Sequence, residues 1–306
     1  MNYFFFILTA IILPILLQVV LGYIVQKVAK LDVHTLSKIQ FYYFIPVFMF
    51  YRLATFDIPA DLLLKVITAC AVLMAALFLL ATGIAWASRL NRSMRKGFQN
   101  SLMFFNSGNI CVPLIELLYT QPIAMVAQMC VLLFQNLTIN SIGMFNSSTG
   151  RKGHLESLIH VFQMPMLYAV GLALAVNYMH IPIWGPLENA IKISSQGMVP
   201  LALFTLGAQL ANTHIGKKLK LPVAASLLRL LVGPLVAWMI IRLTGWSGIP
   251  AQVFFICASA PTAVNTALLA VKFDNEPAFA SQTVLISTLL STVTLAASIY
   301  VAMTWI

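Results

Sequence analysis

Long apolar runs separated by short polar segments dominate the chain. The first run, Tyr3 to Val25, contains no Asp, Glu, Lys or Arg, and Lys27 and Lys30 follow it. A helix needs about 20 mostly apolar residues to cross the hydrocarbon core of a bilayer. Counting such runs predicts ten membrane-spanning helices, at about Tyr3 to Val25, His34 to Thr55, Val66 to Ser88, Gly97 to Tyr119, Pro122 to Phe145, Ser157 to Tyr178, Ile191 to Ala211, Pro222 to Leu243, Pro250 to Val271 and Pro277 to Val301.

Composition supports an all-α polytopic membrane protein. Of the 306 residues, 60% are hydrophobic and 8% are charged, whereas soluble domains carry roughly 45 to 50% and about 25%. The four cysteines lie inside apolar runs without metal-ligand or redox spacing, so the sequence predicts no disulfide framework, metal site or cofactor. They are Cys70, Cys111, Cys130 and Cys257.

The distribution of basic residues predicts an orientation. Eighteen Lys and Arg against eight Asp and Glu give a net charge of +10, but no basic patch is interleaved with aromatic residues, so a nucleic-acid partner is not predicted. Thirteen of the basic residues lie in loops after odd-numbered helices and four in loops after even-numbered ones. By the positive-inside rule the odd loops are cytoplasmic, which places both termini outside the cell membrane.

Prolines recur at an offset close to half the chain length. Five helices per half is an odd number, so a duplicated half would enter the bilayer upside down relative to the first. We therefore expect two inverted five-helix repeats, residues 1–150 and 151–306. The matching prolines are Pro14 with Pro165, Pro46 with Pro200, Pro113 with Pro261, and Pro122 with Pro277.

Helices four and nine combine a proline near the middle of the run with polar amides. Asn106 and Asn109 precede Pro113, and Asn265 follows Pro261. Irregular backbone at membrane depth is tolerated only against protein or a watery cavity. If both helices break at their prolines, the second halves present helix N-termini at the midplane, which suit a carboxylate. Two proline-kinked packing helices are the alternative.

These residues also carry a resemblance to a known family. The stretch Asn106-Ser-Gly-Asn-Ile-Cys-Val-Pro113-Leu resembles the helix-four motif of the auxin efflux carrier family, although Cys111 stands where that pattern has glycine. The stretches around Ala260 to Ala270 and Pro200 to Leu210 are similar to its helix-nine and helix-seven motifs. The family includes bacterial permeases and plant PIN-FORMED proteins, within a bile acid and sodium symporter-like superfamily.

The resemblance implies that helices four and nine cross at their prolines and that the protein exports or exchanges organic anions. Auxin itself is not implied, because the long cytoplasmic loop of the plant members is missing. The candidate substrate-binding residues lie around the two breaks. They are Asn106, Gly108, Asn109, Pro113, Pro261, Thr262 and Asn265.

Glu116 is the only acidic residue inside a predicted span, and Arg229 is the only basic residue not assigned to a loop. Glu116 could hold a coupling proton or cation, since intramembrane carboxylates are functional by default, or it could lie at the interface. Arg229 lies about two turns into helix eight, where snorkelling or a packing hydrogen bond is favoured over substrate contact.

The function that fits best is a secondary carrier for small organic anions that works by alternating access. A sodium- or proton-coupled symporter and a non-transporting membrane sensor remain as alternatives, and a homodimer is a further expectation. An enzyme is not predicted, because the chain has neither a nucleotide-binding loop nor two aspartates inside spans.

Overall fold

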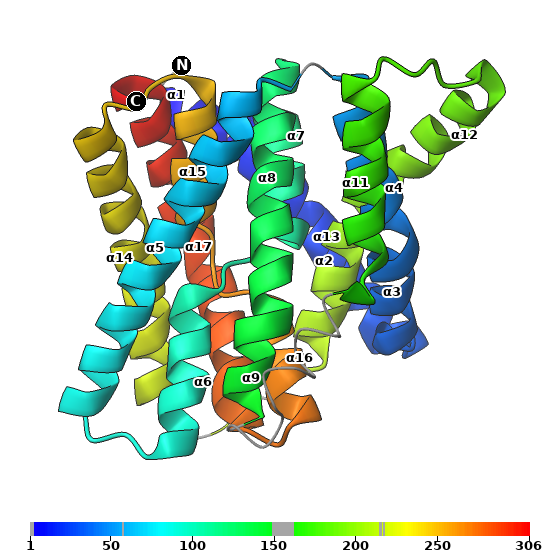
Figure 1. Ribbon diagram of the computed structural model, residues 1–306. Coiled ribbons are helices and arrows are strands. Elements are labelled where there is room, and N and C mark those ends of the chain that lie inside the picture. The colour runs from blue at the N-terminus through cyan, green and yellow to red at the C-terminus, as the bar shows by residue number, and fades with distance from the viewer. Residues whose placement is uncertain (1–2, 57, 149–161, 214–215, 217) are drawn as a thin grey trace.

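The computed structural model describes residues 3–56, 58–148, 162–213, 216 and 218–306, and these residues fold into helices without a sheet (Figure 1). The elements are α1 (Tyr3–Phe6), η1 (Ile7–Ile12), α2 (Leu13–Ala29), α3 (Val33–Ile39), η2 (Gln40–Phe44), α4 (Ile45–Thr55), α5 (Ala60–Ala87), α6 (Arg92–Met103), η3 (Ser107–Cys111), α7 (Val112–Leu118), α8 (Pro122–Thr138), η4 (Ile139–Gly143), α9 (Met144–Ser147), α11 (Pro165–Tyr178), α12 (Gly185–Gln196), α13 (Met198–Ala211), α14 (Lys220–Thr244), α15 (Ile249–Ala258), α16 (Val264–Lys272) and α17 (Pro277–Trp305). The η elements are wide turns of π-helix within longer helical runs.

Besides a buried apolar core, the helices bury many polar side chains and expose many large apolar ones, which is unusual for a soluble protein. In α14 the fully buried face carries Arg229, with Gly233 one turn further along. The opposite face is an exposed apolar stripe at helical spacing, formed by Leu227, Leu231, Leu235 and Met239. A stripe of this kind is stable against lipid tails and unfavourable in water, so the protein is a multi-pass membrane protein.

Within the described residues, five helices are long and apolar enough to cross a membrane on their own: Ile7–Ala29, Asp61–Ala87, Pro122–Ser147, Lys220–Thr244 and Pro277–Trp305. Three shorter apolar helices, Ser107–Leu118, Pro165–Tyr178 and Ile249–Ala258, add to them. The predicted start of the sixth helix, at about Ser157, lies outside the described residues.

The predicted seventh helix is longer than the apolar run that marked it. It begins at Gly185 rather than at about Ile191, and it is divided at Gly197 into α12 and α13. Pro200 has no N–H to donate to the carbonyl four residues earlier, so the helical ladder loses a bond at this point.

The helices form two bundles. One bundle pairs α2 with α13 and α4 with α11, and it occupies the right of Figure 1; the other contains α5 to α9 and α14 to α17. The α2 and α13 pair is tight, because an added Cβ at Gly22 would lie 2.2 Å from the Phe204 carbonyl oxygen and one at Gly207 would lie 2.0 Å from that of Val19. Small residues let membrane helices approach this closely.

Candidate functional site

The chain segments that interrupt helices four and nine lie side by side and are joined by backbone hydrogen bonds. The Asn106 N–H donates to the Pro261 carbonyl at 2.8 Å, and the Ala263 N–H donates to the Phe104 carbonyl at 2.9 Å. Phe105 and Thr262 thereby form an isolated antiparallel β-bridge. The two broken helices therefore cross, and each provides hydrogen-bond partners for free backbone groups of the other. Backbone polar groups inside a membrane need such partners, because no bulk water is present there.

The break in helix four does not lie at Pro113, which corrects the sequence interpretation. The helical run stops at Met103, passes through Phe104 to Asn106 in non-helical backbone, and resumes at Ser107. Pro113 lies buried in the resumed helix at the start of α7. The wide turn of η3 just before it accommodates a residue that cannot donate to the preceding turn, so the proline stays inside a helix. In helix nine, by contrast, Pro261 does lie in the interruption, between α15 and α16.

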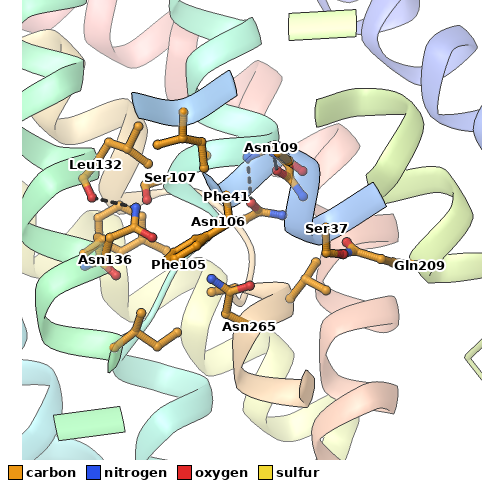
Figure 2. A pocket seen from close by; sticks show the side chains of 17 residues that line it. Ser37, Phe41, Phe105, Asn106, Ser107, Asn109, Leu132, Asn136, Gln209 and Asn265 are labelled. Carbon is orange, nitrogen blue, oxygen red and sulfur yellow. Dashed lines mark hydrogen bonds between the residues drawn. The ribbon is translucent and has the colours of Figure 1, made fainter. Parts of the chain in front are cut away.

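Two helix N-termini meet at the crossing. The side-chain oxygen of Asn106 accepts a hydrogen bond from the Asn109 N–H at 3.0 Å and thus caps η3, while Asn265 lies in the first turn of α16. The first N–H groups of a helix have no partner within it and carry partial positive charge. In Figure 2 the amide ends of Asn106 and Asn265 face the same open space.

A pocket lies at the crossing, between the two bundles. Its empty volume is about 610 Å³, including the part open to solvent, and none of the described residues that line it is charged. Both bundles contribute: the lining residues are Ser37, Gln40, Phe41, Ile45, Phe105, Asn106, Ser107, Gly108, Asn109, Leu132, Gln135, Asn136, Ile139, Gln209, Ala263, Val264 and Asn265.

Several polar atoms at this pocket are buried without a hydrogen-bond partner in the described part of the chain. They are the donor Nδ2 of Asn106 and the acceptors Oε1 of Gln135 and Oε1 of Gln209. Asn106 is only 5% exposed, and a buried donor that stays unpaired costs about 1 to 3 kcal/mol. Such atoms are candidates for contact with a ligand.

Amide side chains also link the crossing to its surroundings, and sequence reasoning did not single these contacts out. The Gln40 amide donates to the Asn109 side-chain oxygen at 2.6 Å, which connects η2 of one bundle to η3 of the other. The buried Gln128 amide donates to the Ser107 carbonyl at 2.7 Å. Both residues are amides inside apolar runs, and that was the signal that could have found them.

A second cavity, toward one end of the molecule, lies next to the pocket. This cavity shares Ser37, Gln209 and Val264 with the pocket and reaches residues 212–213 and 277–278, next to the loops after predicted helices seven and nine. At the other end, Glu116 of α7 forms an ion pair with Arg52 of α4. The end that holds the basic loops therefore has a cavity beside the pocket, and the opposite end has an ion pair between the bundles.

The predicted site residues fall into three groups. Gly108 lines the pocket together with the three asparagines. Pro261 and Thr262 belong to the crossing backbone instead: the fully buried Thr262 hydroxyl donates to the Ser101 carbonyl at 2.9 Å. Pro113 and Glu116 do not line the pocket.

Of the two roles favoured for Arg229 from the sequence, the structure shows the packing hydrogen bond and not snorkelling to a membrane surface. Its side chain is fully buried and donates to backbone carbonyls at the crossing, including that of Leu102 at 2.9 Å. It does not line the pocket.

Comparison with known proteins shows similarity to membrane transport proteins. Residues 151–299 match a family described as membrane transport protein. Over 295 residues, covering 94% of this chain and 96% of the other, the protein is 27% identical to an uncharacterized transporter from Methanothermobacter thermautotrophicus. These matches confirm the resemblance to transport proteins of this family that the motifs indicated.

Proposed function

We propose that this protein is a secondary carrier of the cell membrane that exports or exchanges small organic anions, carboxylates above all, by alternating access. The observation that carries the proposal is the uncharged pocket into which two helix N-termini and the unpaired Asn106 amide are directed. Helix N-termini and neutral donors bind carboxylates without a full countercharge. Release then breaks only hydrogen bonds to a charged group, worth about 1.5 to 3 kcal/mol each.

The architecture supports an inverted duplication of residues 1–150 and 151–306 with ten spans. The first helix of one half packs against the second helix of the other in both combinations, α2 with α13 and α11 with α4. Each half also contributes one broken helix to the crossing. In this proposal both termini face outward, and the basic loops and the cavity that reaches them face the cytoplasm.

The pocket between the bundles supports alternating access. It shares lining residues with a cavity toward the basic end, whereas the Arg52 and Glu116 pair joins the bundles at the other end. Movement of one bundle against the other would break this pair and close the cavity. Export of an anion from an inside-negative cell gains about 2.3 kcal/mol per 100 mV for each charge, so it needs no coupling ion.

A thermal-stability screen of the purified protein tests the proposal. Small monocarboxylic and dicarboxylic acids should raise the melting temperature, and the matching neutral amides should not. The best acid should then show saturable exchange in liposomes. Binding without exchange would identify a sensor, and stabilisation by the amides as well as the acids would contradict the anion site.

A Na⁺ or pH-gradient requirement for exchange would identify a symporter, and chemical cross-linking in detergent would test for a homodimer.

A further inference from the structure

The Arg229 guanidinium is fully buried and bonded to backbone oxygens. Its Nε donates to the Ala260 carbonyl at 3.1 Å, its Nη1 donates to the Leu102 carbonyl at 2.9 Å, and its Nη2 donates to the Ala258 carbonyl. Neither of the two ion pairs in the described part of the chain involves Arg229. Arginine stays charged even when buried, so a full positive charge lies at the crossing.

All three carbonyls lie at or just after the C-terminal end of a helix. Leu102 lies in the last turn of α6, Ala258 ends α15, and Ala260 follows it in the interruption. The last carbonyls of a helix have no partner within it and carry partial negative charge. Arg229 therefore binds the C-terminal ends of both first halves, while the N-terminal ends of both second halves face the pocket.

The surrounding residues pack closely around the guanidinium. Gly233 lies one turn further along α14, where an added Cβ would be 2.5 Å from the Ala258 carbonyl oxygen and 2.8 Å from Arg229 Nη2. The guanidinium carbon lies 5.2 Å from the centre of the Phe105 ring, and Phe105 also lines the pocket. Only glycine at position 233 leaves room for the guanidinium beside the Ala258 carbonyl. The position of Arg229 therefore depends on Gly233.

We propose that Arg229 is a built-in cation that occupies the position a coupling metal ion takes in carriers with broken helices. In such carriers, unwound carbonyls and half-helix C-terminal ends coordinate Na⁺. Here the equivalent oxygens are bonded to a guanidinium that cannot leave or lose its proton. With the negative helix ends neutralised, the positive ends dominate the potential at the pocket. The inference rests on the proposed anion carrier and assigns it a fixed cation in place of Na⁺.

Sodium alone is the first probe, and it needs neither a substrate nor a variant. Replacing choline chloride by sodium chloride at constant ionic strength should leave the melting temperature of the wild-type protein unchanged. A saturable rise with Na⁺ would overturn the inference, because it would reveal a cation site that Arg229 does not fill. This result does not depend on whether organic acids bind.

Arg229→Gln and Arg229→Ala remove the charge, and Arg242→Gln and Arg242→Ala on the same helix are the matched controls. Arg242 lies near the end of α14 over the Trp238 ring, away from the crossing. Arg229→Gln should weaken binding of the best acid from the screen about tenfold or more, since a unit charge acts strongly in a low-dielectric site. Ethylguanidinium at concentrations well below denaturing should raise the melting temperature of Arg229→Ala and not that of Arg242→Ala.

Gly233→Ala keeps the charge and keeps the test decisive if the Arg229 variants do not fold. The added methyl group displaces the guanidinium from Ala258, so acid binding should weaken with the arginine still present. Unchanged acid affinity in Gly233→Ala, or no rescue of a folded Arg229→Ala, would overturn the inference. If no organic acid binds the wild-type protein, the proposed function fails instead, and the sodium experiment still decides whether Arg229 replaces a metal ion.

Discussion

Arg52 and Glu116 form an ion pair that joins α4 to α7, and thus one bundle to the other. The side chains are 19% and 34% exposed, and the Arg52 guanidinium also lies over the rings of Phe48 and Phe56. The pair is located at the end of the molecule opposite the cavity that reaches the basic loops. The pair therefore suits a latch, that is, a contact that holds the two bundles together at that end.

Breaking this pair should destabilise the closed arrangement. Arg52→Gln and Glu116→Gln should each cost about 1 kcal/mol of unfolding free energy, because each leaves a half-buried partner without its countercharge. The exchanged double variant Arg52→Glu with Glu116→Arg should recover part of the loss. Melting temperatures of the four proteins in one detergent measure this coupling, and additive losses without recovery would show that the pair is not a latch.

The same residue allows a test of proton coupling. Since Glu116 already has a cationic partner, we expect Glu116→Gln to leave the pH dependence of acid exchange as it is in the wild-type protein. Exchange in liposomes over a range of pH measures this. Disappearance of the pH dependence in Glu116→Gln would instead assign the coupling proton to Glu116.

The two roles of Asn106 can be separated by substitution. Asn106→Ala removes both the cap on the Asn109 N–H and the unpaired donor, and it should weaken binding of the transported acid roughly ten- to hundred-fold. Asn265→Ala should have an effect of the same order. Asn106→Asp retains an oxygen for the cap but places a negative charge at the pocket, so it should abolish acid binding while the protein still folds. Wild-type affinity in both alanine variants would exclude the crossing as the substrate site.

The close approach of α2 and α13 predicts a difference between glycines. Gly22→Ala and Gly207→Ala should lower the melting temperature by several degrees, because each new Cβ would collide with backbone of the other helix. Gly83→Ala is the matched control: nothing lies within 4 Å of its added Cβ, and alanine is the better helix former. Equal effects at all three positions would contradict the packing.

Thiol labelling tests the orientation, with little background because all four native cysteines are buried. Asn91, between α5 and α6, and Trp305, at the end of α17, are exposed. In Figure 1 the connection between α5 and α6 and the C-terminus lie at opposite ends of the molecule. In intact cells an impermeant reagent should label Trp305→Cys and spare Asn91→Cys, because the loop near Asn91 is basic. The opposite pattern would reverse the proposed topology.

Features that depend on one helix at a time could be predicted from the sequence. The apolar run predicted a helix from Pro222 to Leu243, and α14 extends from Lys220 to Thr244. The uncharged amides beside the breaks were also predicted, and Asn106, Asn109 and Asn265 do line one pocket. Run length and residue type suffice for these features because the bilayer fixes how long an apolar helix must be.

Features that depend on two helices could not be predicted. The break in helix four lies at residues 104–106 because its backbone pairs with the segment around Pro261, and no local signal marks that pairing. Pro113 was a misleading signal, because the wide turn of η3 just before it accommodates a residue that cannot donate to the preceding turn. The bond between Gln40 and Asn109 and the carbonyls around Arg229 likewise join residues far apart in the chain.

The bridge between Phe105 and Thr262 is made by main-chain atoms alone, since its bonds run from the Asn106 and Ala263 amides to the Pro261 and Phe104 carbonyls. Every amino acid except proline supplies the same donor and acceptor. Side chains that face the pocket, such as those of Asn109 and Asn265, can consequently be exchanged while this framework is kept. Substrate selectivity can thus evolve by replacing a few amide side chains. Changing the substrate of the protein needs no change in the backbone that supports the pocket.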